Sequence, residues 1–253
     1  MHILLTNDDG IYAPGLAALK ESLAPLGKVT VVAPAAEQSG VGLSITYRHP
    51  LMAREEYIHG ESFGYAVYGS PADCVKMGVL EFCGERPDLI VSGINSGANI
   101  GINVLYSGTV AAAIEGAFFG ITSIAVSQSM MTAPDYDKTA ERAAEVIQQL
   151  LDHEPETGSL WNLNFPHESE EGPKGLKVVS IGCNRQEERL EKRTDPRGKP
   201  YYWCGLEPIS GHSKDPGSDI EGIQDGYATL SPLHFDLTET KRLEEYRQKS
   251  FAI

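Results

Sequence analysis

Two neighbouring carboxylates follow the first apolar run of the chain, and they are the first residues whose spacing suggests chemistry. Residues 3–5 are all large and apolar, which is typical of a parallel strand covered on both faces, and Asp8 and Asp9 follow them closely. Parallel α/β sheets bind ligands beyond the carboxyl ends of their strands. Because two carboxylates in one site repel each other, the pair indicates a divalent metal. The alternative is a solvated turn that ends at Gly10.

Further oxygen donors follow later strands. Ser39 lies in the loop after a strand predicted over residues 28–34, and Asn95 follows a strand predicted over residues 89–92. Each alone would also fit an ordinary turn, but the carboxyl ends of parallel strands share one edge of a sheet. Carboxylate, hydroxyl and amide oxygens suit magnesium, manganese or calcium, whereas the scattered histidines do not support a zinc site. The expected metal ligands are Asp8, Asp9, Ser39 and Asn95.

An anion site is the second chemical feature of the sequence. Ser107, Gly108 and Thr109 directly precede an alanine-rich segment, residues 110–119, that predicts a helix. A helix amino terminus favours a nearby anion by about 0.3–1 kcal/mol, so a phosphate could bind there. The alternative is simple capping of the helix by Ser107 or Thr109.

The elements that must position these residues alternate between strand and helix. Strands are predicted near residues 3–5, 28–34, 65–68, 89–92, 121–126, 160–165, 177–181 and 227–230, and helices near 13–27, 70–82, 110–119, 136–151 and 237–248. This alternation predicts an α/β fold with a doubly wound, mostly parallel sheet. Residues 185–203 are charged and then aromatic, which suggests a projecting hairpin for a subunit contact or, more simply, a solvated loop.

Composition argues against several functional classes. A net charge of −14 argues against binding long nucleic acid, which requires clustered Lys and Arg. No apolar run approaches the roughly 20 residues of a membrane span, so we expect no membrane association. The four cysteines lack C-x-x-C spacing and no leader-like segment precedes the first strand, so we expect a reducing cytoplasm. A small phosphorylated substrate remains compatible with the acidic charge.

Other catalytic motifs are not supported. Residues 60–64 match G-x-S-x-G, but that motif requires a strand before it and a helix after it, and here a strand is predicted to follow. Neither a P-loop nor a G-x-G-x-x-G dinucleotide motif is present. A serine hydrolase and a nucleotide cradle of these types are therefore not expected.

Five separated blocks together resemble the SurE survival-protein family. They are Asn7-Asp8-Asp9-Gly10, Glu37-Gln38-Ser39-Gly40, Gly69-Ser70-Pro71-Ala72-Asp73-Cys74-Val75, Ser92-Gly93-Ile94-Asn95-Ser96-Gly97 and Tyr106-Ser107-Gly108-Thr109-Val110. The resemblance covers about the first 130 residues and is weaker beyond them. It implies a Rossmann-like core, residues 1–183, and a region, residues 184–253, whose hairpin, late strand and C-terminal helix complete the core and support a homodimer or homotetramer.

The resemblance also implies an activity. Members of the family are metal-dependent phosphatases that act on nucleoside 5′- and 3′-monophosphates, and some trim short polyphosphate. The implied metal ligands are Asp8, Asp9, Ser39 and Asn95, and the implied phosphate-facing residues are Asn7, Ser107, Gly108 and Thr109. We expect one Mg²⁺ or Mn²⁺ ion per subunit, with Asp8, Asp9 and Asn95 as catalytic residues and a water molecule as the nucleophile.

Three alternatives remain beside this hypothesis. Asp8 could attack phosphorus itself, although the D-x-D spacing that supports such chemistry is absent. A phospho-receiver module also carries paired acids after its first strand, but it needs an Asp and a Lys after later strands, where this chain has Ser92-Gly93 and Ser127-Gln128. The third alternative is a nucleotide-binding sensor without turnover.

Overall fold

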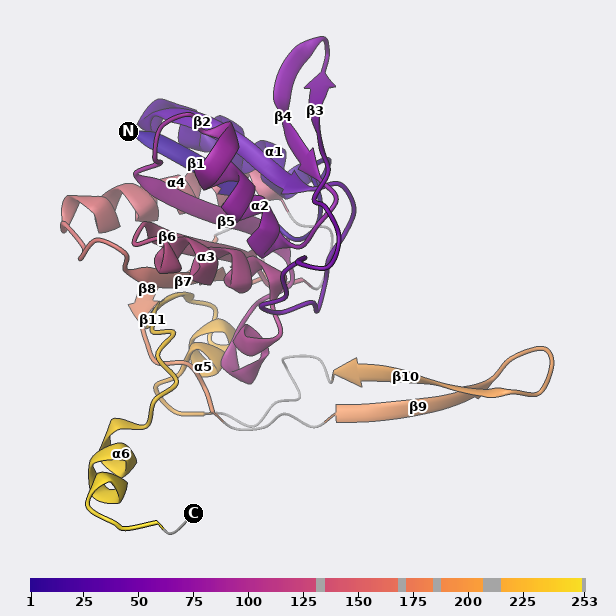
Figure 1. The fold of residues 1–253 in the computed structure, drawn as a ribbon, viewed down its shortest axis with the longest axis vertical. Helices are drawn as coiled ribbons and strands as arrows, with labels where there is room; N and C mark the ends of the chain where they lie inside the picture. The colour runs from indigo at the N-terminus through magenta and orange to yellow at the C-terminus, as the bar shows by residue number, and fades with distance from the viewer. Residues whose placement is uncertain (131–134, 168–171, 184–187, 207–214, 252–253) are drawn as a thin grey trace.

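A computed structural model of the protein describes residues 1–130, 135–167, 172–183, 188–206 and 215–251. Within these residues the fold is built on a nine-stranded sheet with the order β3-β4-β2-β1-β5-β6-β7-β11-β8 (Figure 1). The strands are β1 (His2–Thr6), β2 (Lys28–Pro34), β3 (Ala53–Ile58), β4 (Glu61–Val67), β5 (Leu89–Ser96), β6 (Thr122–Gln128), β7 (Leu160–Phe165), β8 (Leu176–Val178) and β11 (Ala228–Leu233). The helices are α1 (Pro14–Leu23), α2 (Pro71–Met77), α3 (Gly108–Phe118), α4 (Tyr136–Asp152), α5 (Asp219–Gln224) and α6 (Thr240–Arg247).

The central strands of the sheet are parallel, as the alternation of elements predicts. β1 pairs in parallel with β2 on one side and with β5 on the other, and the parallel arrangement continues through β6 to β7. The carboxyl ends of β1, β2, β5 and β6 therefore meet at one edge. Antiparallel pairs occur where β3 meets β4 and where β11 meets β7.

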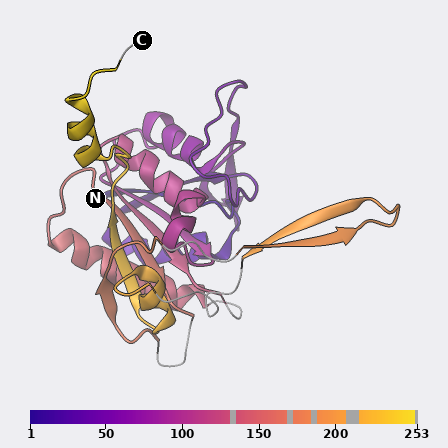
Figure 2. The same cartoon turned by 90° about the horizontal axis from the view of Figure 1, so that it is seen from below.

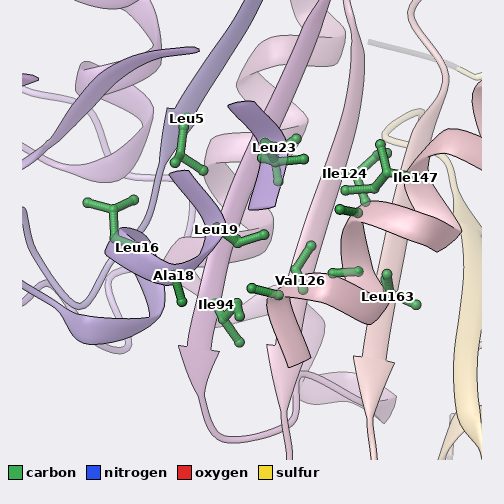
Figure 3. Close-up of a cluster of buried hydrophobic side chains, with 14 of the residues drawn as sticks. Leu5, Leu16, Ala18, Leu19, Leu23, Ile94, Ile124, Val126, Ile147 and Leu163 are labelled. Carbon is green, nitrogen blue, oxygen red and sulfur yellow. The ribbon is translucent and has the colours of Figure 1, made fainter. Parts of the chain in front are cut away.

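Helices cover both faces of the sheet, because alternate residues of each buried strand point to opposite sides. Leu5 of β1 packs with Leu16 and Leu19 of α1 and with residues of α4, and Figure 3 shows this apolar cluster. Leu4 packs instead with residues of α2 and α3, such as Val75. The two helix layers confirm the doubly wound fold.

Local signals set the helix boundaries. Ser70 accepts a hydrogen bond from the backbone N–H of Asp73, and the Asp73 carboxylate accepts one from the backbone N–H of Ser70, forming the capping box that begins α2. A π-helical turn, η2 (Gly78–Phe82), continues α2, so the predicted helix over residues 70–82 divides into two pieces.

The structure forms an edge strand where the sequence shows only a weak alternation, over residues 51–58. β3 carries the exposed charged side chains of Arg54 and Glu55, and its register shifts between Glu56 and Tyr57. Both features obscure the alternation that predicts a strand. β4 includes Ser62, so the G-x-S-x-G match lies in a turn and a strand and is not a nucleophile elbow.

The last part of the chain contributes both to the sheet and to extensions from it. β11 lies between β7 and β8, whereas β9 (Glu188–Thr194) and β10 (Pro200–Leu206) form a separate antiparallel hairpin. Figures 1 and 2 show the hairpin and α6 projecting away from the sheet. Residues 184–187, at the start of the predicted hairpin, lie outside the described residues. Among the described residues, no helix is long and apolar enough to cross a membrane.

α3 approaches the sheet closely because its inner side is built from small residues. A Cβ atom at Gly116 would lie 2.6 Å from Ile90 Cδ1 and would also contact the Ser123 hydroxyl. Gly116→Ala should therefore lower the free energy of unfolding by about 1–3 kcal/mol, because overpacking outweighs the gain of about 1 kcal/mol in helix propensity. Denaturant unfolding measures this, with exposed Gln149→Ala on α4 as a control expected to stay within about 0.5 kcal/mol. A stabilised Gly116→Ala variant would contradict the close packing.

Candidate active site

The candidate site lies where the loops after β1, β2 and β5 converge. The backbone N–H of Gln38, in the loop after β2, donates to the backbone oxygen of Asp8 at 2.8 Å. The backbone N–H of Ser96, at the end of β5, donates to Asp9 Oδ2 at 3.3 Å. These bonds hold the predicted donors Ser39 and Asn95 in segments directly tied to the two acids.

The first turn is shaped by Asn7. Asn7 is fully buried, and its side-chain amide donates to the Gly10 oxygen at 3.0 Å while its Oδ1 accepts from the Gly10 N–H at 3.2 Å. Gly10 has a φ of +103°, which favours glycine. The Asn7 side chain is therefore committed to the turn that presents Asp8 and Asp9.

Asp8 lies against the amino terminus of α3. Its side chain is buried, and Thr109 Oγ1 donates to Asp8 Oδ1 at 2.6 Å. A Cβ atom at position 108 would lie 2.9 Å from Asp8 Oδ2, so glycine is required for this close approach. The pKa of Asp8 is raised to about 6, chiefly by burial and also by the charge of Asp9, against the lowering effect of the Thr109 hydroxyl.

Asp9 is more exposed than Asp8, but its charged form is also disfavoured. Burial raises the pKa of Asp9, the Ser96 N–H opposes that shift, and the charge of Glu37 adds to it. Both carboxylates are therefore unfavourable as a bare negative pair. A bound cation would remove this cost, so the electrostatics and the oxygen donors fit a divalent metal.

The other two predicted ligands have different local contacts. Asn95 lies within the last residues of β5, and its Nδ2 donates to the Gly97 oxygen at 2.7 Å, which leaves Oδ1 as the end of the amide able to serve a cation. Ser39 is exposed, and its hydroxyl donates to Glu37 Oε1 at 2.7 Å. The Ser39 side chain is thus engaged with Glu37 and not with Asp8 or Asp9.

The predicted phosphate-facing residues divide by role. Ser107 caps α3, since its Oγ accepts from the Val110 N–H at 3.2 Å, as the capping alternative predicts. Thr109 is fully buried and its hydroxyl serves Asp8. Gly108 allows the close approach of Asp8 to the amino terminus of α3. An anion at this terminus would be stabilised by the helix dipole and by backbone N–H groups.

Sequence reasoning missed a group of buried asparagines behind the site. Asn99, Asn162 and Asn164 are buried, Asn162 and Asn164 both hydrogen bond to the backbone of Asn99, and the Asn99 side chain lies beside Thr109. A signal was present in the sequence. Asn162 and Asn164 alternate within the otherwise apolar strand β7, so both point to the same buried face of the sheet.

Comparison with known proteins identifies the family of the chain. The family model described as Survival protein SurE matches residues 3–188. The 5′-nucleotidase SurE of Rhodopirellula baltica is 51% identical over 251 residues and 98% of each chain, and that of Syntrophomonas wolfei is 41% identical over 253 residues, covering 100% of this chain and 95% of the relative. The crystal structure of the SurE protein from Aquifex aeolicus superposes with a TM-score of 0.84 at 38% identity and 98% coverage of both chains. This chain therefore belongs to the SurE family.

Proposed function

We propose that this protein is a nucleotidase that hydrolyses nucleoside 5′-monophosphates, and also 3′-monophosphates, to nucleoside and phosphate. The observation that carries the proposal is the buried Asp8 carboxylate beneath the amino terminus of α3, with Asp9 beside it. The relatives named 5′-nucleotidase SurE support the same activity. Short-chain polyphosphate is a further proposed substrate, because its terminal phosphate presents the same charge and shape to the site.

The proposed cofactor is one divalent cation, Mg²⁺ or Mn²⁺. Asp8, Asp9, Ser39 and Asn95 would hold it, and the raised pKa values of the two acids are the observation that supports a cation beside them. When bound, such an ion offsets phosphate charge and lowers the pKa of a water molecule. The Ser39 hydroxyl donates its hydrogen to Glu37, and the lone pairs of its oxygen would remain available to the cation.

The chain's own groups perform the remaining tasks. The Thr109 hydroxyl and the backbone N–H of Thr109 favour Asp8 as a carboxylate, which keeps it available as a ligand. The amino terminus of α3, at Ser107 and Gly108, provides partial positive charge for phosphate oxygens. Asn7 maintains the turn that directs both acids to this place.

The phospho-receiver alternative gains no support from the fold. β5 ends at Ser96 and β6 ends at Gln128, so the described structure places neither the phosphorylatable Asp nor the Lys of a receiver at these strand ends. The sensor alternative is separated from an enzyme by measuring turnover.

We expect phosphate release from 5′-AMP and 3′-AMP in the presence of Mn²⁺ or Mg²⁺. A chelator should abolish release and excess cation should restore it, because the carboxylate pair needs a counter-charge. Colorimetric phosphate assays measure this, with tripolyphosphate tested in parallel. Absence of release under every condition would overturn the enzyme proposal, and tight AMP binding without release would favour the sensor.

Asp8→Asn should lower kcat/KM for 5′-AMP by at least about 10- to 100-fold. Loss of a group that only supports a metal ligand typically has an effect of this size, and Asp8 is a proposed ligand itself. Steady-state kinetics measure the loss, and circular dichroism should show an intact fold. Asp88→Asn is the matched control, because Asp88 lies at the opposite edge of the sheet, where it accepts from the His2 N–H at 2.7 Å. Equal activity of Asp8→Asn and Asp88→Asn would remove Asp8 from the site.

We also propose that the protein acts in the cytoplasm. The four cysteines are free thiols in the structure, two buried and two exposed, and unpaired exposed thiols fit a reducing compartment.

Self-association as a homodimer or homotetramer is also proposed. Leu190 and Tyr202 lie on one face of the projecting β9–β10 hairpin and Trp203 on the other, and all three are exposed, as is Phe251 after α6. Exposed aromatic residues on an extended arm are typical of a subunit contact.

Replacing Tyr202 and Trp203 together by serine should reduce the mass of the assembly, because the hairpin loses its large apolar contacts. Sedimentation velocity measures the mass, with Lys199→Ser in the hairpin turn as the control expected to assemble normally. A wild-type protein that sediments as a monomer would contradict the proposed assembly.

A further inference from the structure

A chain of buried hydrogen bonds leads from β7 to Asp8. Asn99 Nδ2 lies 2.9 Å from Ser127 Oγ and 3.4 Å from Thr109 Oγ1, and Thr109 Oγ1 lies 2.6 Å from Asp8 Oδ1. A threonine hydroxyl has one hydrogen. Because its oxygen accepts from the Asn99 amide, that hydrogen is directed to Asp8.

The backbone of Asn99 is itself held by side chains of β7. The Asn99 N–H donates to Asn164 Oδ1 at 2.8 Å, and Asn164 Nδ2 donates back to the Asn99 oxygen at 3.1 Å. Asn162 Nδ2 donates to the same oxygen at 2.8 Å. The orientation of the Asn164 amide is unambiguous, because the backbone N–H requires an oxygen and the backbone carbonyl requires an N–H.

One hydrogen bond of this buried network is missing in the part of the chain that the structure describes. Asn162 and Asn164 are fully buried on the face of the sheet that also packs Val110, Ala125 and Leu160. Among the described residues, Asn162 Oδ1 has no hydrogen-bond partner, which is costly in such a place. Within that part of the chain, the network thus contains one unpaired buried oxygen and ends on a carboxylate of the candidate site.

We propose that Asn99 is a positioning residue for Asp8. Asn164 holds the Asn99 backbone, Asn99 orients the Thr109 hydroxyl, and that hydroxyl keeps Asp8 Oδ1 on one fixed partner, so that the carboxylate has one orientation when a cation binds. This inference rests on the proposed function, because it assigns the network to the proposed metal site. Residues behind metal ligands typically act in this way.

Four variants test the chain of contacts. Thr109→Val removes the hydroxyl at nearly constant shape, Thr109→Ser retains it, and Asn99→Leu removes the side-chain amide and keeps the backbone bonded to Asn164. The fourth variant combines Thr109→Val with Asn99→Leu. Mn²⁺ affinity is measured by titration calorimetry without substrate, and kcat and KM for 5′-AMP are measured separately.

Thr109→Val and Asn99→Leu should each weaken Mn²⁺ binding or kcat/KM by about 10- to 100-fold, whereas Thr109→Ser should remain close to the wild type. The loss of Mn²⁺ affinity or kcat/KM in the double variant should not exceed the larger of the two single-variant losses, because Asn99 acts only through the hydroxyl that is already missing. Additive losses would overturn the inference, and so would a Thr109→Ser variant as weak as Thr109→Val. If Asn99→Leu fails to fold, Asn99→Ala takes its place, because it removes the same side-chain amide and keeps the backbone bonds of Asn99.

Thr229→Val is the matched control. Thr229 is fully buried directly opposite Asn164 in the β7–β11 register, and within the described residues its hydroxyl has no hydrogen-bond partner. The Thr229→Val variant should bind Mn²⁺ like the wild type. A loss of Mn²⁺ affinity equal to that of Thr109→Val would show that packing alone is responsible. The Mn²⁺ affinities of the variants could show the expected non-additive losses while the wild type releases no phosphate. That outcome would overturn only the proposed activity. Phosphate release by the wild type together with additive losses in the Thr109 and Asn99 variants would overturn only this inference. A wild-type protein that binds neither Mn²⁺ nor Mg²⁺ would overturn both the proposed metal site and this inference.

Discussion

The contact between the Asp8 carboxylate and the amino terminus of α3 is the interaction on which the candidate site depends. Burial disfavours the charge on Asp8, and the Thr109 hydroxyl and backbone N–H oppose that effect. The contact exists only because Gly108 has no side chain and because small residues such as Gly116 let α3 lie close to β5 and β6. The packing of the core and the geometry of the site are therefore one arrangement.

The side chains on the α3 face of the sheet change from apolar to polar toward the carboxyl ends of the strands. Leu4 and Ile90 pack against helices on the α3 side, whereas Thr6, Ser92 and Ser127, further along the same faces of their strands, are polar and fully buried. The opposite face stays apolar through Val91 and Val126. A polar patch thus lies beneath the carboxyl edge, where parallel α/β folds bind ligands.

Much of the fold followed from local pattern, and the parts that did not have physical causes. Apolar runs and capping residues identified β1, β5 and the start of α2 because these signals lie within a few residues of one another. β3 was missed because its exposed charges and register shift break the alternation. The insertion of β11 between β7 and β8 was not readable either, because strand order depends on pairings between segments far apart in the sequence.

The sequence by itself determined which residues offer oxygen donors, since Asp8, Asp9 and Asn95 stand at or just beyond strand ends that apolar runs identify. Only the tertiary structure decided how individual atoms are used. The hydroxyl of Thr109, a predicted phosphate-facing residue, donates to Asp8, a residue 101 positions away, and Asn99 is held by Asn164, 65 positions away. Such contacts depend on how α3 and β7 pack around the sheet, and no local pattern of residue types carries that information.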